Sequence, residues 1–353
     1  MTFDVLSLSD SDKWDKYIHL LNIQNQDIYY TPEYYRVYEE LGNGMAQCFV
    51  FKMNNEIAIY PFLKNSVNNI GYDLNDEYYD IQGVYGYNGV VSSTQKPEFI
   101  SAFYKSFDLY CQNEKIIAEF TRFHPLIGNK SFSENHLHVF FDRKTIYIDL
   151  RNPYEIIFKK FQTTTRKQIK RAENRNGIKV IKYENDTSIL DIFWMIYTVT
   201  MNRVQAIPYL YFSKDYFKSL IENTKSICLL AFYEDKPIAA IIALYNDYYI
   251  HGHLGGVLTE FLHLSPFSLL YSEMIKVGQN KSCNYLHVGG GATNNLDDPL
   301  LKFKMNFSNL YADFFIGKKI HNHSIYNKVI SQWEMKSLVK KKENDNILLK
   351  YRY

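Results

Sequence analysis

The feature that most constrains this chain is the stretch from Tyr285 to Phe307, where a short apolar run, three glycines and an amphipathic segment follow one another. Residues 285–288 are β-prone, and the glycines at 289–291 permit backbone conformations that a Cβ forbids. Asp298 followed by proline is the pattern of an N-cap and a first helical turn, and apolar residues then recur at helical spacing. The stretch therefore predicts a strand, a glycine turn and a helix.

Lys304 flanks the apolar stripe of this predicted helix. A lysine beside an apolar face is usually a surface residue, and three glycines are usually a tight turn. Taken together, Gly289-Gly290-Gly291 and Phe303-Lys304-Met305-Asn306-Phe307 resemble the signature of the FemAB-like branch of the GNAT acyltransferases. This resemblance implies two tandem GNAT-like domains and an acyltransferase activity. Lys304 is a candidate either to stabilise developing negative charge or to contact phosphate.

The length of 353 residues allows two domains that each bury a core. We expect an N-terminal GNAT-like domain over residues 1–143 and a C-terminal GNAT-like acyltransferase domain over residues 144–353. The predicted fold class is α/β (α+β), in which each domain has a mixed, largely antiparallel sheet flanked by helices.

The second half has a regular order of predicted elements. A helix opens at Pro153, runs to about residue 176 and ends at Gly177, and further helices cover residues 188–204, 214–222 and 267–279. Three consecutive strands are expected at residues 226–233, 237–245 and 248–254. The first of these helices carries a basic cluster that either contacts phosphates or is simply a solvated face. The cluster comprises Arg166, Lys167, Lys170, Arg171 and Arg175.

Overall composition excludes several classes of protein. The formal net charge is only +2, so bulk charge does not predict nucleic acid binding. The four cysteines have no paired spacing, which argues against a zinc site or a disulfide framework, and no metal site is predicted. With no signal-like N-terminus and no apolar run of about 20 residues, we expect a cytoplasmic protein without a membrane span.

The best candidates for a general base are His251 and His253, because residues two apart on a strand point to the same face. An amine that attacks a thioester must lose a proton, and a neutral imidazole accepts it near pH 7. The alternative is that one or both are satisfied core histidines. We therefore predict His251, His253 and Lys304 as the catalytic set.

Glycines near these residues offer backbone N–H groups for a developing oxyanion or for the donor. In the GNAT family, which this half resembles, acyl-CoA is the co-substrate. The segment from Gly255 to Leu262 does not fit the usual Gln/Arg-x-x-Gly-x-Gly/Ala loop of that family, which leaves the mode of CoA binding and the donor open. The predicted cofactor-binding residues are Gly255, Gly256, Gly289, Gly290 and Gly291.

In the first half, two segments around residues 85–89 and 122–126 resemble polysaccharide-associated FemAB-like members. This resemblance implies an acceptor that is a nucleotide-linked amino sugar, such as a dTDP- or UDP-linked amino-dideoxyhexose for O-antigen or another surface polysaccharide. The planar guanidinium of arginine can donate two hydrogen bonds to a diphosphate, and the ring of tyrosine can stack on a base or sugar. The predicted substrate-binding residues are Tyr85, Tyr87, Asn88, Arg122, His124 and Arg203.

Two other functions remain open from the sequence. One is aminoacyl transfer from tRNA to a peptidoglycan precursor, which requires a basic surface for the RNA backbone and is disfavoured by the near-neutral charge. The other is a non-catalytic module that binds a nucleotide sugar. Loss of turnover without loss of folding on alanine substitution separates an enzyme from such a module.

Overall fold

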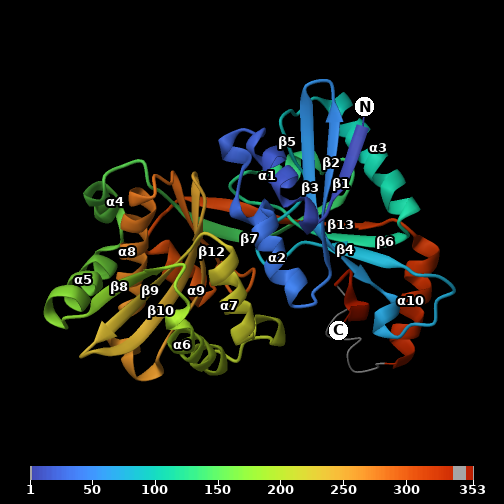
Figure 1. Cartoon of the computed structure of the whole chain (residues 1–353). Helices are drawn as coiled ribbons and strands as arrows, with labels where there is room; N and C mark the ends of the chain where they lie inside the picture. The colour runs from blue at the N-terminus through green and yellow to red at the C-terminus, as the bar shows by residue number, and fades with distance from the viewer. Residues whose placement is uncertain (1, 337–346, 353) are drawn as a thin grey trace. The chain divides into compact units, whose positions relative to one another are not determined.

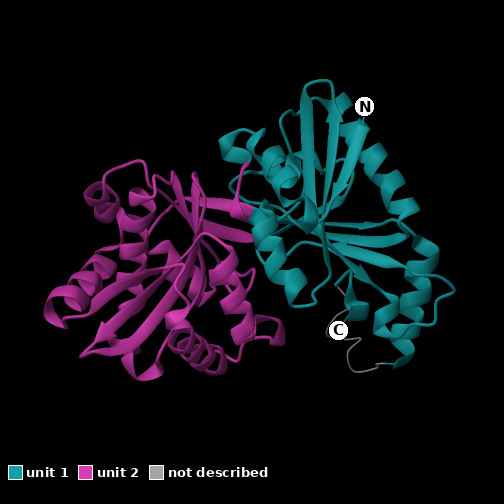
Figure 2. Cartoon of the chain, viewed as in Figure 1, with its two compact units in different colours: residues 1–25, 29–142, 314–353 teal, residues 26–28, 143–313 magenta. Residues whose placement is uncertain are grey.

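The computed structural model describes residues 2–336 and 347–352, and it divides the chain into two compact units (Figure 2). Unit 1 comprises residues 1–25, 29–142 and 314–353, and unit 2 comprises residues 26–28 and 143–313. The expected division at residues 143/144 lies one residue from the boundary between residues 142 and 143. Residues 314–353, which that division assigns to the second domain, lie in unit 1 instead.

Unit 1 contains a mixed sheet in the order β1-β2-β3-β4-β6-β13, with β5 paired to β3 (Figure 1). Its strands are β1 (Thr2–Leu6), β2 (Met45–Met53), β3 (Glu56–Ser66), β4 (Tyr79–Gln82), β5 (Val91–Ser92), β6 (Ile116–Arg122) and the C-terminal part of β13 (Tyr311–Ile320). Its helices are α1 (Ser11–His19), α2 (Pro32–Glu40), α3 (Pro97–Asn113) and α10 (His323–Lys336).

Within unit 2 the hydrogen-bonded strands follow the order β7-β12-β11-β10-β9-β8. Its strands are β7 (His138–Asp149, from residue 143 onward), β8 (Lys179–Glu184), β9 (Ser226–Tyr233), β10 (Lys236–Tyr245), β11 (Tyr249–Val257) and β12 (Tyr285–Gly290). Its helices are α4 (Tyr154–Lys160), α5 (Thr163–Lys170), α6 (Leu190–Arg203), α7 (Lys214–Asn223), α8 (Pro266–Asn280) and α9 (Pro299–Met305).

The two units repeat one topology. Each has antiparallel strands followed by a single parallel pair, β4 with β6 in unit 1 and β11 with β12 in unit 2. The strand that completes each sheet comes from a distant part of the chain: β7 follows β6 in sequence but pairs with β12, and β13 follows β12 but pairs with β6. This exchange explains why the C-terminal residues return to unit 1, where Trp333 and Tyr351 join a buried cluster.

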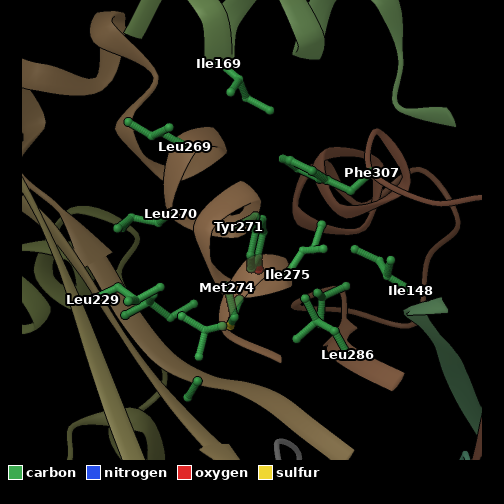
Figure 3. Packing of buried hydrophobic residues seen from close by; sticks show 14 of the residues in the cluster. Ile148, Ile169, Leu229, Leu269, Leu270, Tyr271, Met274, Ile275, Leu286 and Phe307 are labelled. Atoms are coloured by element: carbon green, nitrogen blue, oxygen red, sulfur yellow. The ribbon is translucent and has the colours of Figure 1, made fainter. Parts of the chain in front are cut away.

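The core of unit 2 lies between its sheet and helices α4, α5 and α8. Leu270, Met274 and Ile275 of α8 are fully buried, and Figure 3 shows them among Leu229, Leu286 and other apolar side chains of the sheet. Burial of each such side chain contributes about 1.5–3 kcal/mol. The opposite face of the sheet carries α6, which contacts β11 and β10. The predicted mixed sheet flanked by helices is therefore confirmed.

One predicted helix is interrupted. The segment expected to be continuous from Pro153 to residue 176 forms α4, a break at Phe161 and Gln162, then α5 and a π-helical turn at Arg171–Arg175. Phe161 is extended and buried, and its ring lies 5.2 Å from that of Phe307. The Gln162 N–H donates to the Asn306 carbonyl. Tertiary packing therefore overrides helical continuity at this point.

Candidate active site

The three glycines, which we call the glycine turn, lie at the end of β12. The strand continues two residues beyond its predicted end at residue 288, because Gly289 and Gly290 still pair with β7. Gly289 has φ of +76°, a conformation that side chains rarely adopt. A Cβ on Gly290 would lie 2.8 Å from the Lys144 carbonyl oxygen, and one on Gly291 would lie 2.6 Å from Oδ1 of Asp298. Each of the three glycines is therefore required by a close approach or by its backbone conformation.

Asp298 fastens this turn to α9. Its carboxylate accepts hydrogen bonds from the backbone N–H groups of Leu300 (2.9 Å) and Leu301 (3.1 Å), and from the N–H and hydroxyl of Thr293 (both 2.9 Å). Burial opposes the negative charge, but these hydrogen bonds outweigh it and hold the pKa of Asp298 at about 2. Asp298 is thus both the N-cap and a permanent negative charge beside the turn.

Lys304 projects from α9 back toward the turn. Its side chain is buried, with a residue exposure of 8%, and its Nζ donates a 2.7 Å hydrogen bond to the Gly290 carbonyl. The same Nζ lies 3.2 Å from the place where a Cβ of Gly289 would stand. Burial lowers the pKa of Lys304 to about 7, which the negative charge of Asp298 opposes and the positive charge of Arg143 reinforces. The amine is therefore partly neutral at neutral pH.

Arg143 adds a second cation to this site. It belongs to β7, and its Nη1 donates to the carbonyls of Gly291 (2.9 Å) and Ala292 (3.1 Å). It thereby holds the loop after β12 and disfavours a proton on Lys304. The sequence analysis did not single out Arg143, because its neighbour β12 lies about 145 residues further along the chain.

The parallel strands β11 and β12, which carry the histidines of this unit, pair over only part of their length. The parallel ladder joins Tyr249–His251 to Tyr285–His287 and ends there, although β11 continues to Val257 and β12 to Gly290. Relative to its antiparallel partner, β11 has an extra residue at His253, and β12 has one at Val288. Bulges of this kind twist and bend a strand, and they are common beside active sites.

His251 is held by an acidic residue that the sequence analysis missed. Its Nε2 lies 2.7 Å from Oδ2 of Asp27, and both side chains are buried. Its ring centroid lies 5.5 Å from that of His287. Asp27 precedes His251 by 224 residues, so no local sequence pattern connects them. A carboxylate in this position orients the imidazole.

His253 is less suited to accept a proton. It lies on the same face of β11 as His251, since a Cβ on the intervening Gly252 would point toward Met274 of α8. Its Nε2 lies 2.9 Å from the hydroxyl of Tyr216. Burial and the neighbouring His251 lower the pKa of His253 to about 3. At neutral pH His253 is therefore uncharged and hydrogen-bonded to Tyr216, which agrees with the alternative that it is a core histidine with its hydrogen bonds satisfied.

Three further predicted residues have structural roles in unit 2. A Cβ on Gly255 would lie 2.6 Å from the Ala240 carbonyl oxygen, and one on Gly256 would lie 2.5 Å from Oγ1 of Thr200. Arg203 donates from Nη1 to the Val257 carbonyl at 2.7 Å. The two glycines are therefore explained by packing of β11 against β10 and α6, and Arg203 by closure of the end of β11.

In unit 1, Asn88 holds two segments together. Its Oδ1 accepts from the Arg122 N–H at 2.8 Å, and its own N–H donates to the Arg122 carbonyl at 2.7 Å. Its carbonyl accepts from Tyr30 and Asn129. Since Asn88 is also fully buried, its side chain serves the fold of this unit rather than a substrate.

His124 has a similar structural role. It is fully buried, and its Nδ1 accepts from the backbone N–H groups of Leu126 (3.2 Å) and Ile127 (3.1 Å). The guanidinium of Arg122 remains partly exposed and donates to the Val84 carbonyl at 3.3 Å. Tyr85 and Tyr87 are also partly exposed. Four of the six residues predicted to bind substrate are therefore partly exposed to solvent: Tyr85, Tyr87, Arg122 and Arg203.

Comparisons with known proteins agree with this architecture. Residues 159–304 match the family model described as an acetyltransferase (GNAT) domain. No curated protein sequence matches the chain significantly. The structure is similar to FemX, with a TM-score of 0.68 and 12% identity over 93% of this chain and 99% of that chain.

Two other solved structures have the same fold. A tandem GNAT protein from the clavulanic acid biosynthesis pathway has a TM-score of 0.52 and 9% identity over 91% of this chain and 98% of that one. The C-terminal domain of a putative lysylphosphatidylglycerol synthetase from Agrobacterium fabrum has a TM-score of 0.52 and 10% identity over 93% and 96%. The TM-scores show that these proteins share the fold of this chain, and at such low identity the similarity shows the fold alone.

The solved structures thus show a GNAT-like fold. The match of residues 159–304 to a GNAT acetyltransferase domain confirms the prediction that the chain is an acyltransferase. Domains of this family generally use acyl-CoA. Among the described residues, none of the helices has both the length and the apolar character that crossing a membrane requires.

Proposed function

We propose that this protein is a FemAB-like N-acyltransferase that moves an acyl group from acyl-CoA to the amine of a nucleotide-linked amino sugar. The observation that carries the chemical part of this proposal is Lys304, a buried amine hydrogen-bonded to the Gly290 carbonyl, with its pKa lowered to about 7. A general base works best when its pKa lies near the working pH. Lys304 meets this requirement better than His253 does.

In the proposed reaction, the acceptor amine attacks the carbonyl carbon of the thioester, so that a C–N bond forms and the C–S bond breaks. The neutral Nζ of Lys304 accepts the proton that the attacking nitrogen loses, and the sulfur leaves as the CoA thiolate. Asp298, with its pKa at about 2, stays ionised and stabilises the resulting ammonium. His251, oriented by Asp27, is the second candidate for proton transfer.

The acceptor class rests on the resemblance of residues 85–89 and 122–126 to polysaccharide-associated members. Tyr85, Tyr87 and Arg122 remain the proposed contacts to the base, sugar and diphosphate, because each is partly exposed. Since nucleotide sugars and CoA esters are made in the cytoplasm, the proposal places the reaction there.

The test begins with calorimetric titration of coenzyme A and acetyl-CoA into the purified protein. Binding in the micromolar range, about −8 kcal/mol, supports the CoA donor. A screen of UDP- and dTDP-linked amino sugars for release of free thiol then tests the acceptor. No detectable heat at several temperatures and no thiol release with any acceptor would contradict the proposed donor.

A second candidate function is aminoacyl transfer from tRNA to a peptidoglycan precursor. It is favoured by the similarity to FemX, which extends over 93% of this chain and 99% of FemX. The same Lys304 chemistry would then act on an ester instead of a thioester. Transfer of a labelled amino acid from charged tRNA to a muropeptide precursor, without any CoA-dependent turnover, would favour this function over the first.

A further inference from the structure

A strongly basic surface lies on unit 2, on the segment that runs from α4 through α5 to the π-helical turn. We call it the basic face. Seven basic and two acidic residues give residues 154–176 a formal charge of +5, against +2 for the whole chain, so the remaining residues carry −3. The basic face consists of Lys159, Lys160, Arg166, Lys167, Lys170, Arg171 and Arg175.

The segment is fixed to unit 2 by its other side. Ile157, Phe161, Ile169 and Ala172 are buried in the hydrophobic core at spacings of three, four and eight residues. Figure 3 shows Ile169 near Leu269 in this core. Because the apolar stripe faces inward, the basic side chains point outward, and six of the seven residues are exposed, Arg166 being partly buried. The basic face is therefore a rigid surface of the folded unit.

Within the described part of the chain, none of the seven cations forms an ion pair with a carboxylate. Other lysines of the same unit do so, for example Lys276 with Glu273 at 2.6 Å. The residue pairs 166/170 and 167/171 bring like charges one α-helical turn apart, which destabilises a helix by about 0.2–0.5 kcal/mol per pair. Clustered charge of one sign creates a potential that attracts an anionic partner.

The neighbouring apolar residue indicates the kind of partner. Ile156 is 44% exposed and lies three and four residues before Lys159 and Lys160, on the same side of α4. Among residues 154–176, all of which the structure describes, no aromatic side chain reaches a comparable exposure on which a nucleobase would stack. A cationic surface with an exposed aliphatic side chain matches the headgroup region of an anionic bilayer.

We propose that the basic face binds peripherally to membranes that contain anionic lipids, and that it does so independently of the proposed acyl transfer. The lysine and arginine side chains contact headgroup phosphates, and Ile156 inserts into the boundary between headgroups and acyl chains. We expect recognition of surface charge and no preference among anionic lipids of equal charge.

The test is co-sedimentation of the full chain with vesicles of phosphatidylcholine, with or without about 30% phosphatidylglycerol. We expect binding only to the anionic vesicles, weakened at least about tenfold when salt rises from about 0.05 to 0.3 M. K167E/K170E/R171E should lower the partition coefficient at least about tenfold, and Ile156→Ser about two- to fivefold. Circular dichroism melting verifies that each variant is folded.

The matched control is K16E/K105E/K218E, which makes the same change in net charge at three exposed lysines elsewhere on the chain. It should retain binding to within about twofold. Equal loss in the control would show that only net charge matters, and absence of binding to anionic vesicles would overturn the proposal. Binding of a structured RNA that is lost in K167E/K170E/R171E, without vesicle binding, would assign the face to nucleic acid instead.

Discussion

Two segments of this protein are rich in glycine, residues 83–89 in unit 1 and residues 289–291 in unit 2. They differ in the side chains that their glycines face. In the loop of unit 1, a Cβ on Gly83 would lie 2.4 Å from the Asn88 side chain, and one on Gly86 would lie 2.4 Å from the Tyr29 ring. In the turn of unit 2, Gly289 faces the Lys304 amine and Gly291 faces the Asp298 carboxylate. The first loop makes room for neutral packing groups, and the second brings charged groups together.

This difference separates a structural loop from a candidate active site. Asn88 uses its backbone and side-chain oxygens in hydrogen bonds that join neighbouring segments. Lys304 is instead an ionisable group whose pKa is shifted from 10.5 to about 7. Ionisable groups with strongly shifted pKa values are concentrated at functional sites. The density of glycine alone does not distinguish the two loops.

The largest expected effect comes from removing the Lys304 amine. Lys304→Met keeps an unbranched side chain of similar length but cannot accept a proton, so kcat/KM should fall by about 10²–10⁴-fold. The matched control is Lys302→Met two residues away, where the lysine is exposed and pairs with Asp297. Steady-state thiol release measures both variants. Activity within about threefold of wild type in Lys304→Met would remove Lys304 from the mechanism.

In unit 1 the expected effect is on stability. Asn88→Ala leaves the partly buried N–H of Arg122 without its 2.8 Å acceptor, so the free energy of unfolding should fall by about 1–3 kcal/mol. The kcat of the folded fraction should stay within about twofold of wild type. Urea denaturation and thiol release give the two values. A large loss of kcat with unchanged stability would indicate that Asn88 binds substrate, and the loop of unit 1 would then not be purely structural.

The pH dependence of stability should reveal the charge on Lys304. Because its folded-state pKa of about 7 lies below its ordinary value of 10.5, the folded protein binds fewer protons between these values. Stability should therefore rise with pH across this interval. Subtracting the Lys304→Met curve from the wild-type curve should leave a gain of about 2 kcal/mol from pH 7 to 9. A flat difference curve would show an unshifted pKa.

The smallest expected effect concerns Asp27, which acts through His251. Asp27→Asn keeps a side chain that reaches His251 but removes the carboxylate that orients its imidazole, so kcat should fall about tenfold with little change in KM. The pH–rate profile should shift in this variant. If only the unfolding midpoint changes and the profile does not, Asp27 has a structural role.

Local patterns account well for unit 2. Three successive strands with turn residues between them predict the antiparallel meander of β9, β10 and β11, and an aspartate–proline pair predicts the start of α9. The exchange of β7 and β13 between the units was not predictable, since it depends on pairing between strands more than a hundred residues apart. The break at Phe161 was missed for a similar reason, because it is caused by packing on Phe307.

The candidate site was predictable only in part. Periodicity identified Lys304 beside an apolar stripe, but surface exposure was the ordinary expectation, and only the fold of the glycine turn buries its amine. Arg143 and Asp27 have no signal in the sequence near the turn or near β11. Their roles depend on tertiary contacts with residues that lie about 150 and 224 positions away.

The central claim is that the Lys304 amine loses its proton near neutral pH. The most direct measurement is NMR of the lysine side chains, with Cε and Nζ isotopically labelled, recorded from pH 5 to 11 for the wild type and for Lys304→Met. One resonance should titrate near pH 7 in the wild type and be missing from the variant. If every lysine resonance titrates above about pH 10, as ordinary lysines do, Lys304 is protonated throughout and cannot be the proton acceptor.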